Sequence, residues 1–99
     1  MCMDAKGRRA LSIIRACIDA ERYLALPHFV ERMGERGLVW PDVQAVIDEP
    51  TDVRSDGHDR WRRPKWIVSG KAADGLAIEI VCVLDTDDDG NITVFITIY

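Results

Sequence analysis

Apolar residues in the first part of the chain recur at the spacing of one helical face. Leu11, Ile14 and Ile18 follow the three-, four- and seven-residue intervals of an amphipathic helix, which predicts a helix over residues 5 to about 23. Asp4 stands just before this segment and is a candidate N-cap, because its carboxylate can accept hydrogen bonds from the first backbone N–H groups. The chain is therefore expected to open with a helix that buries one face.

Two shorter helices are predicted next, and each is opened by a proline. Pro27 suits the first position of a helix, because its missing N–H would be unpaired there in any case. Gly37 supplies the left-handed residue that commonly ends a helix. The third helix begins at Pro41 and ends before Pro50, since the residue that precedes a proline avoids the helical region.

The period of the apolar positions changes to two after Pro50, which indicates strands. The predicted strands are residues 51–55, 65–72, 76–85 and 92–99. Turn sequences at residues 73–75 and 85–91 join the last three strands as antiparallel neighbours. We therefore expect one α+β domain over residues 1–99, in which two to three N-terminal helices pack on a four-stranded antiparallel sheet.

Composition and cysteine usage narrow the class of protein. An apolar fraction of 47% and a charged fraction of 30% are typical of a globular domain and argue against disorder. No apolar run reaches the roughly 18 residues of a membrane span, and no signal peptide is recognisable, so we expect a cytoplasmic protein with no membrane partner. Cys2, Cys17 and Cys82 form no CxxC pair, and Cys17 and Cys82 are expected in the core.

The distribution of charge is more informative than the net charge of −4. Residues 54–71 carry six bases and two acids, whereas residues 72–99 carry six acids and no base. Residues 1–36 carry a net charge of +2. A fold that brings the two basic segments together would present a basic face to a partner. The alternative is a solvated charged surface without a partner.

A polar stripe runs along the second predicted helix. His28, Arg32 and Arg36 recur at every fourth residue and lie within a sector of about 80°. Arginine binds phosphate through paired hydrogen bonds, and histidine can move a proton near neutral pH, so the stripe suits phosphate chemistry. The alternative is an exposed helix whose arginines pair with glutamates at i, i+4 spacing. The residues expected to face the core from this helix are Phe29, Val30 and Met33.

Residues 60–66, RWRRPKW, interleave four bases with two indoles. Surfaces that bind single-stranded nucleic acid have this composition, because cations hold the phosphates while aromatic faces stack on bases. Trp66 lies inside a predicted strand and is expected in the core. Trp61 is left with two interpretations, a stacking platform or an ordinary surface residue.

The aspartate-rich turn at residues 85–91 resembles the start of a calcium-binding loop. Its aspartates and Gly90 stand in the right order, but the twelfth position, which should be glutamate, is Ile96. The segment that follows is also a predicted strand, whereas a calcium loop of this type is followed by a helix. We therefore expect a hairpin turn, no metal ion and no cofactor.

Several of these segments together resemble a known family. HFVERMGERG (residues 28–37) fits an H-x3-RM-x2-RG motif, and the chain closes on VFITIY (residues 94–99). Over residues 27–99 the chain is similar to small RelE-like bacterial proteins of a domain-of-unknown-function type, which share this opening and close on a strand of the form VxTxY. The first predicted helix extends the resemblance toward the MqsR toxins.

The resemblance implies a RelE-like fold and the toxin of a type II toxin–antitoxin system, a metal-independent endoribonuclease that cleaves mRNA. The implied partners are RNA and a cognate antitoxin protein of zinc-ribbon or helix-turn-helix type. In such enzymes the ribose 2′-OH attacks the adjacent phosphate while protein groups move protons and stabilise charge. The alternative is a non-catalytic module of the same fold that binds a protein or RNA.

The resemblance and the residue chemistry together give two sets of candidate residues. The candidate catalytic residues are His28, Arg32, Lys65 and Tyr99. The candidate nucleic-acid-binding residues are Arg36, Arg54, Arg60, Trp61, Arg62, Arg63 and Lys71. Arg54 falls where the MqsR toxins place a basic residue in their first strand. Tyr99 has an alternative role, in which its ring only fastens the last strand to the core.

Overall fold

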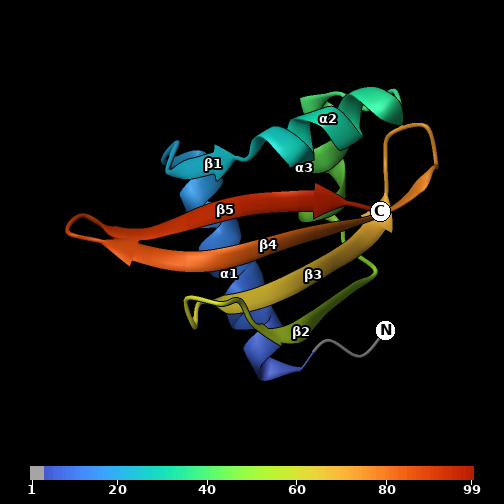
Figure 1. The fold of residues 1–99 in the computed structure, drawn as a ribbon. Coiled ribbons are helices and arrows are strands. Elements are labelled where there is room, and N and C mark those ends of the chain that lie inside the picture. Colours follow the sequence, from blue (N-terminus) through green and yellow to red (C-terminus); the bar gives the residue numbers. More distant parts are fainter. Residues whose placement is uncertain (1–3) are drawn as a thin grey trace.

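The computed structural model describes residues 4–99, which form three helices and a five-stranded sheet (Figure 1). The elements are α1 (Ala5–Asp19), β1 (Tyr23–Ala25), α2 (Pro27–Glu35), α3 (Trp40–Asp48), β2 (Asp52–His58), β3 (Pro64–Lys71), β4 (Ala77–Asp87) and β5 (Gly90–Ile98). The strand order is β1-β5-β4-β3-β2. The predicted α+β class is confirmed, while Cys2 lies outside the described residues.

The sheet is mixed, so the prediction of four antiparallel strands is wrong in one respect. Strands β2 to β5 form the expected antiparallel meander, but β1 adds a fifth strand parallel to β5. The first helix was predicted to reach about residue 23, whereas it ends at Asp19 and Glu21 takes a left-handed φ of 57°. A strand of three residues is too short to display alternation, which is why the pattern did not reveal it.

Apart from the end of α1, the predicted helix boundaries are confirmed to within one residue. Asp4 caps α1, since its Oδ1 accepts a hydrogen bond of 2.7 Å from the Gly7 N–H. Pro27 is the first residue of α2, and Gly37 follows the helix with a left-handed φ of 65°. The third helix begins one residue earlier than predicted, at Trp40.

All three helices cover the same face of the sheet. Val53, Val68, Ile80 and Ile98 are neighbours across β2, β3, β4 and β5, and all four are buried against the helices. In Figure 1, α1 crosses behind β3 and β4. Trp66 packs against this core, as predicted. The buried residues also include both cysteines that the sequence placed in the core, Cys17 and Cys82.

An aromatic cluster fixes α2 against β5. Phe95 is fully buried, and its ring centroid lies 6.0 Å from that of Tyr23, 5.3 Å from that of Phe29 and 5.6 Å from that of Trp40. Tyr23 and Trp40 stack on each other with their centroids 5.0 Å apart. Because these residues come from β1, α2, α3 and β5, the cluster holds α2 along the part of β5 that β1 does not cover.

The opposite face of the sheet, called here the helix-free face, carries no helix within residues 4–99 (Figure 1). Alternation along the strands places Arg54, Ile67, Val81 and Thr97 in one row on this face. Val81 and Thr97 are nevertheless only 3% and 5% exposed. The centre of this face is therefore closely packed, and its charged side chains lie around that centre.

Candidate functional site

Four polar residues meet on the helix-free face, where β5 ends. Tyr99 and Glu79 lie directly opposite each other, because each donates its backbone N–H to the carbonyl oxygen of the other at 2.9 Å. Glu79 Oε2 accepts hydrogen bonds from Arg54 Nη2 at 2.7 Å and from Ser69 Oγ at 3.2 Å. Tyr99 is 60% exposed. We call Arg54, Ser69, Glu79 and Tyr99 the strand-end cluster.

The ion pair inside the strand-end cluster keeps both of its partners charged. The hydrogen bond from Arg54 is the main reason why the pKa of Glu79 lies below its usual value, and the same bond raises the pKa of Arg54. Arg54 Nη1 also donates to Ser69 Oγ at 3.0 Å. The guanidinium is therefore held by Ser69 and by Glu79, the residue opposite Tyr99, and can stabilise negative charge there.

The lowered pKa of Glu79 predicts a loss of stability in acid. A carboxylate whose pKa is lower in the folded state stabilises the fold above its unfolded value, and this contribution disappears as the pH falls through the folded value. Glu79→Gln is therefore expected to weaken the decline in stability below the ordinary glutamate pKa of 4.5. Urea denaturation of both proteins at neutral and acidic pH measures the difference.

Glu35→Gln is the matched control for this experiment. The Glu35 carboxylate is 63% exposed, and its ion pair with Arg32 Nη1 is long, at 3.5 Å. The control should keep the acid dependence of the wild type. An identical pH dependence in Glu79→Gln and the wild type would contradict the assignment.

The arginines of the predicted polar stripe bind the backbone next to the strand-end cluster. Arg32 Nε donates to the Ile98 carbonyl at 3.1 Å, and Arg36 Nη2 donates to the Ala77 carbonyl at 3.4 Å. The stripe therefore faces the end of β5 and the start of β4. The pair between Arg32 and Glu35 is long and exposed, so the pairing of charges along the helix surface does not explain the stripe.

His28 and Val30 have different surroundings from those arginines. The side chain of His28 is exposed and makes no hydrogen bond or ion pair within residues 4–99. It lies one turn from Arg32 and about 40° around the helix from it. Val30 was expected to face the core but is 55% exposed, because it lies about 100° around the helix from the buried Phe29.

Lys65 lies away from the other candidate catalytic residues. It occupies the helix-free face of β3, where its Nζ is 3.4 Å from the Asp56 carboxylate. Ser69 of the strand-end cluster is four residues further along β3, or about 13 Å, and β5 lies two strands away, or about 10 Å. The structure therefore brings Arg32 and Tyr99 to one end of the sheet and does not bring Lys65 to them.

The connection between β2 and β3 presents Trp61 to solvent on a fixed backbone. Asp59 Oδ1 accepts hydrogen bonds from the N–H groups of Trp61 and Arg63 at 3.0 and 2.9 Å. Burial alone would raise the pKa of Asp59, but its hydrogen bonds with Arg63 and Trp61 lower it. The guanidinium carbons of Arg60 and Arg63 lie 4.2 and 5.0 Å from the Trp61 ring centroid. We call residues 60–63 the tryptophan loop.

Acidic side chains pair with three of the six bases in the 54–71 segment, which was predicted to contribute to a basic face. Arg54 pairs with Glu79 and Asp52, Lys65 pairs with Asp56, and Arg63 pairs with Asp59 and Asp85. The sequence could not show these pairs, because several of them join different strands. Among the candidate bases within residues 4–99, Arg36, Arg60, Arg62 and Lys71 have no ion pair. Free positive charge in the 54–71 segment is therefore concentrated in the tryptophan loop.

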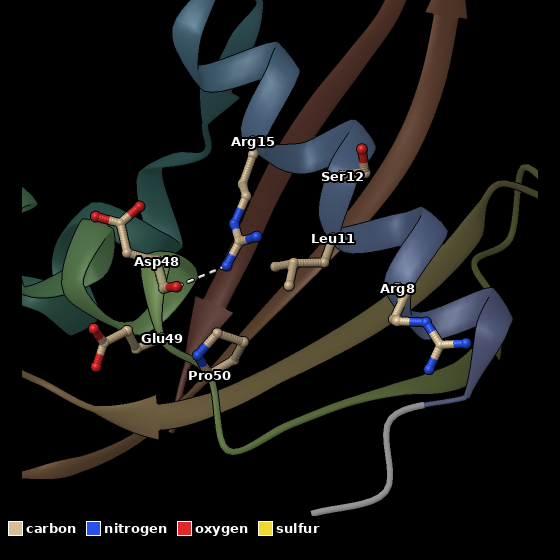
Figure 2. A pocket seen from close by; sticks show the side chains of 7 residues that line it. All are labelled: Arg8, Leu11, Ser12, Arg15, Asp48, Glu49 and Pro50. Atoms are coloured by element: carbon tan, nitrogen blue, oxygen red, sulfur yellow. Dashed lines mark hydrogen bonds between the residues drawn. The ribbon is translucent and has the colours of Figure 1, made fainter.

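A groove of about 570 Å³ lies on the other side of the molecule, between α1 and the end of α3 (Figure 2). Arg15 crosses it and donates from Nε to the Ile47 carbonyl at 3.1 Å and from Nη2 to the Asp48 carbonyl at 2.7 Å. These carbonyls belong to the last turn of α3, so Arg15 caps that helix. None of the candidate catalytic or nucleic-acid-binding residues lines this groove.

The aspartate-rich turn is a hairpin, as predicted. Asp87 pairs with Gly90 in the ladder, and its carboxylate is engaged by Arg22. Asp85 is engaged by Arg63. No three His, Cys, Asp or Glu side chains within residues 4–99 come together in a way that could hold a metal ion.

Two residues of the strand-end cluster were not among the predicted site residues. Ser69 and Glu79 stand at polar positions inside otherwise apolar strands. Glu79 is the single charge in the run AIEIVCVL, and this interruption is the signal that would have identified it. Its partner Arg54 is 25 residues away in sequence, so only the strand register could join them.

Comparison with known proteins places most of the chain in one family. The model of the family "Domain of unknown function (DUF4258)" matches residues 26–99. No curated protein and no solved structure matches the chain significantly. None of the helices within residues 4–99 has the length and apolar character needed to cross a bilayer.

Proposed function

The chain belongs to the DUF4258 family of domains of unknown function, and from this premise we propose that it is a metal-independent endoribonuclease with a RelE-like fold. We propose further that it acts on mRNA as the toxin of a type II toxin–antitoxin pair, with a cognate antitoxin protein of zinc-ribbon or helix-turn-helix type. The observation that best supports cleavage is the strand-end cluster, where Glu79 holds the guanidinium of Arg54 and the exposed Tyr99 lies opposite Glu79. The arginines of α2 bind the backbone at Ile98 and Ala77, next to this cluster.

The proposed reaction is transesterification of RNA. The ribose 2′-oxygen loses its proton and bonds to the adjacent phosphorus, while the bond from phosphorus to the 5′-oxygen breaks and that oxygen gains a proton. The products are a 2′,3′-cyclic phosphate and a 5′-hydroxyl. Protein groups must therefore accept one proton, donate one proton and stabilise the charge of the phosphorane.

The residues around the end of β5 can divide these tasks. Arg54 is held by Glu79 and Ser69, so it can offer fixed N–H donors to the phosphorane oxygens. Tyr99 is exposed opposite Glu79, the partner of Arg54, and can exchange a proton with the leaving oxygen. His28 has no competing hydrogen bond within residues 4–99 and is the candidate base for the 2′-hydroxyl.

A second function, binding without cleavage, is favoured by two observations. Lys65 lies away from Arg32 and Tyr99, and acidic side chains neutralise Arg54, Arg63 and Lys65. If the strand-end cluster does not act on phosphate, the remaining features are those of a binding module. The tryptophan loop provides an exposed indole and free arginines, which suit RNA binding without cleavage. The two functions differ in whether bound RNA is cut.

Induced expression in bacteria is expected to arrest growth if the chain is a toxin. Arg54→Ala should relieve the arrest, because it removes the fixed cation of the strand-end cluster. Arg32→Ala should also relieve it, but Arg32 additionally tethers α2 to β5, so its variant requires a test of folding by circular dichroism. Growth curves after induction measure the effect.

Arg9→Ala is the matched control, since Arg9 is exposed on α1, which covers the opposite face of the sheet. This variant should arrest growth as the wild type does. Normal growth despite abundant folded wild-type protein would exclude the toxin and leave the binding module.

A further inference from the structure

The indole of Trp61 is exposed, yet its surroundings are rigid. The side chain is 61% exposed, and Asp59 fixes the backbone on both sides of it through two N–H groups. Arg62 completes the loop with a left-handed φ of 63°. Exposing a large aromatic surface to water is unfavourable, so a loop that holds an indole in this position is suited to a stacking partner.

The two arginines beside the ring have different freedom. Arg63 is fixed by Asp59 at 2.7 Å and by Asp85 at 3.2 Å. Arg60 lies closer to the ring, at 4.2 Å, and has no ion pair within residues 4–99. A flat base can therefore displace Arg60 from the ring, and the released guanidinium can bind the neighbouring phosphate.

The helix-free face connects the tryptophan loop with the strand-end cluster. The loop and the end of β5 lie at opposite ends of the sheet (Figure 1). Ser69 lies six positions after Arg63 along the chain, which corresponds to about 20 Å in an extended strand. Lys65 lies between these ends on the same face. At a stacked spacing of about 3.4 Å per nucleotide, this path accommodates roughly six nucleotides of one strand, and fewer if the strand is stretched.

We propose that Trp61 anchors a single-stranded RNA by stacking on one base, while a phosphate about 20 Å further along the strand lies at the strand-end cluster. This inference rests on the proposed function and adds the class and minimum length of its substrate. A paired duplex does not fit, because its bases are already stacked and present only their edges. Full affinity requires a single strand of roughly six nucleotides.

Binding of a graded series of oligoribonucleotides, from a dinucleotide to a twelve-residue strand, tests the proposal in chelator-containing buffer. Wild-type affinity should rise with length and level off near roughly six nucleotides. Trp61→Ala should weaken binding of the long strands about 10-fold, while Trp61→Phe should retain most of the affinity. Val39→Ala is the matched control, since Val39 is also an exposed apolar residue, 59% exposed, but lies at the start of α3.

Two further ligands separate the possible outcomes. A DNA strand of the same sequence should bind through the same stacking but remain uncut, because it lacks the 2′-hydroxyl. A hairpin duplex that binds as tightly as the single strand, or long strands that bind Trp61→Ala as they bind the wild type, would overturn the inference. Length-dependent binding without cleavage would leave it standing and reject the proposed ribonuclease. Cleavage by the wild type that is independent of RNA length and of Trp61 would support the proposed ribonuclease and reject the Trp61 anchor. If the protein binds no strand at all, both the anchor and the ribonuclease are rejected.

Discussion

Tyr99→Phe is expected to slow RNA cleavage about 100-fold, the usual scale of one general acid or base. The substitution removes the hydroxyl but keeps the ring, whose neighbour across the strands is Glu79. Affinity for RNA should stay nearly unchanged, because the cations of the helix-free face and Trp61 are untouched. Single-turnover cleavage of a single-stranded RNA in the presence of a chelator measures the rate.

Tyr23→Phe is the matched control for this variant. Tyr23 lies in the aromatic cluster, stacked on Trp40, and is far from the helix-free face of β3. It should cut RNA at the wild-type rate. If Tyr99→Phe also cuts at the wild-type rate, the phenol has no part in proton transfer and Tyr99 only fastens the last strand.

The same cleavage assay tests whether His28 or His58 contributes to the rate. His28→Ala should lower the rate about 100-fold if its imidazole accepts the proton of the 2′-hydroxyl. His58→Ala is the control, because His58 is exposed at the end of β2 and pairs with Pro64 beside the tryptophan loop. Equal rates for His28→Ala and the wild type would assign the base to another group and leave the fold and the family unaffected.

Local patterns predicted most of the elements because each carried its own signal. Pro27 and Gly37 mark the two ends of α2, and alternation marks the strands of the meander. Strand β1 was missed because it has only three residues and is stabilised by its pairing with β5, about 70 positions away. Such pairing depends on tertiary contacts that no window of sequence contains.

The candidate site was predictable only in its residue types. The stripe of Arg32 and Arg36 was recognisable, but its position at the end of β5 depends on the packing of Phe29 on Phe95. The cluster around Glu79 likewise depends on the register of three strands. The segments of like charge along the sequence suggested a basic face. In the fold, acidic side chains from other strands lie among those bases, and the charge of a sequence segment cannot predict this.

Phe95→Ala is expected to destabilise the protein by about 3–5 kcal/mol, the cost of removing a buried phenyl ring and leaving a cavity. Phe95 is fully buried and contacts the rings of Tyr23, Phe29 and Trp40. Total stabilities of small domains are about 5–15 kcal/mol, so the variant should be close to unfolding at room temperature. The midpoint of urea denaturation measures the loss.

Tyr99→Ala provides the control, because it removes an aromatic ring from the end of the same β5 segment at a position that is 60% exposed. Its midpoint should fall much less. The loss of stability in Phe95→Ala should also differ between parts of the fold. The Leu26 N–H donates to the Phe95 carbonyl, and α2 begins at the next residue, so α2 should be affected most. Hydrogen exchange should therefore show α2 losing protection before β3, which lies two strands away from β5. Equal protection of α2 in the variant and the wild type would mean that the aromatic cluster does not position the stripe.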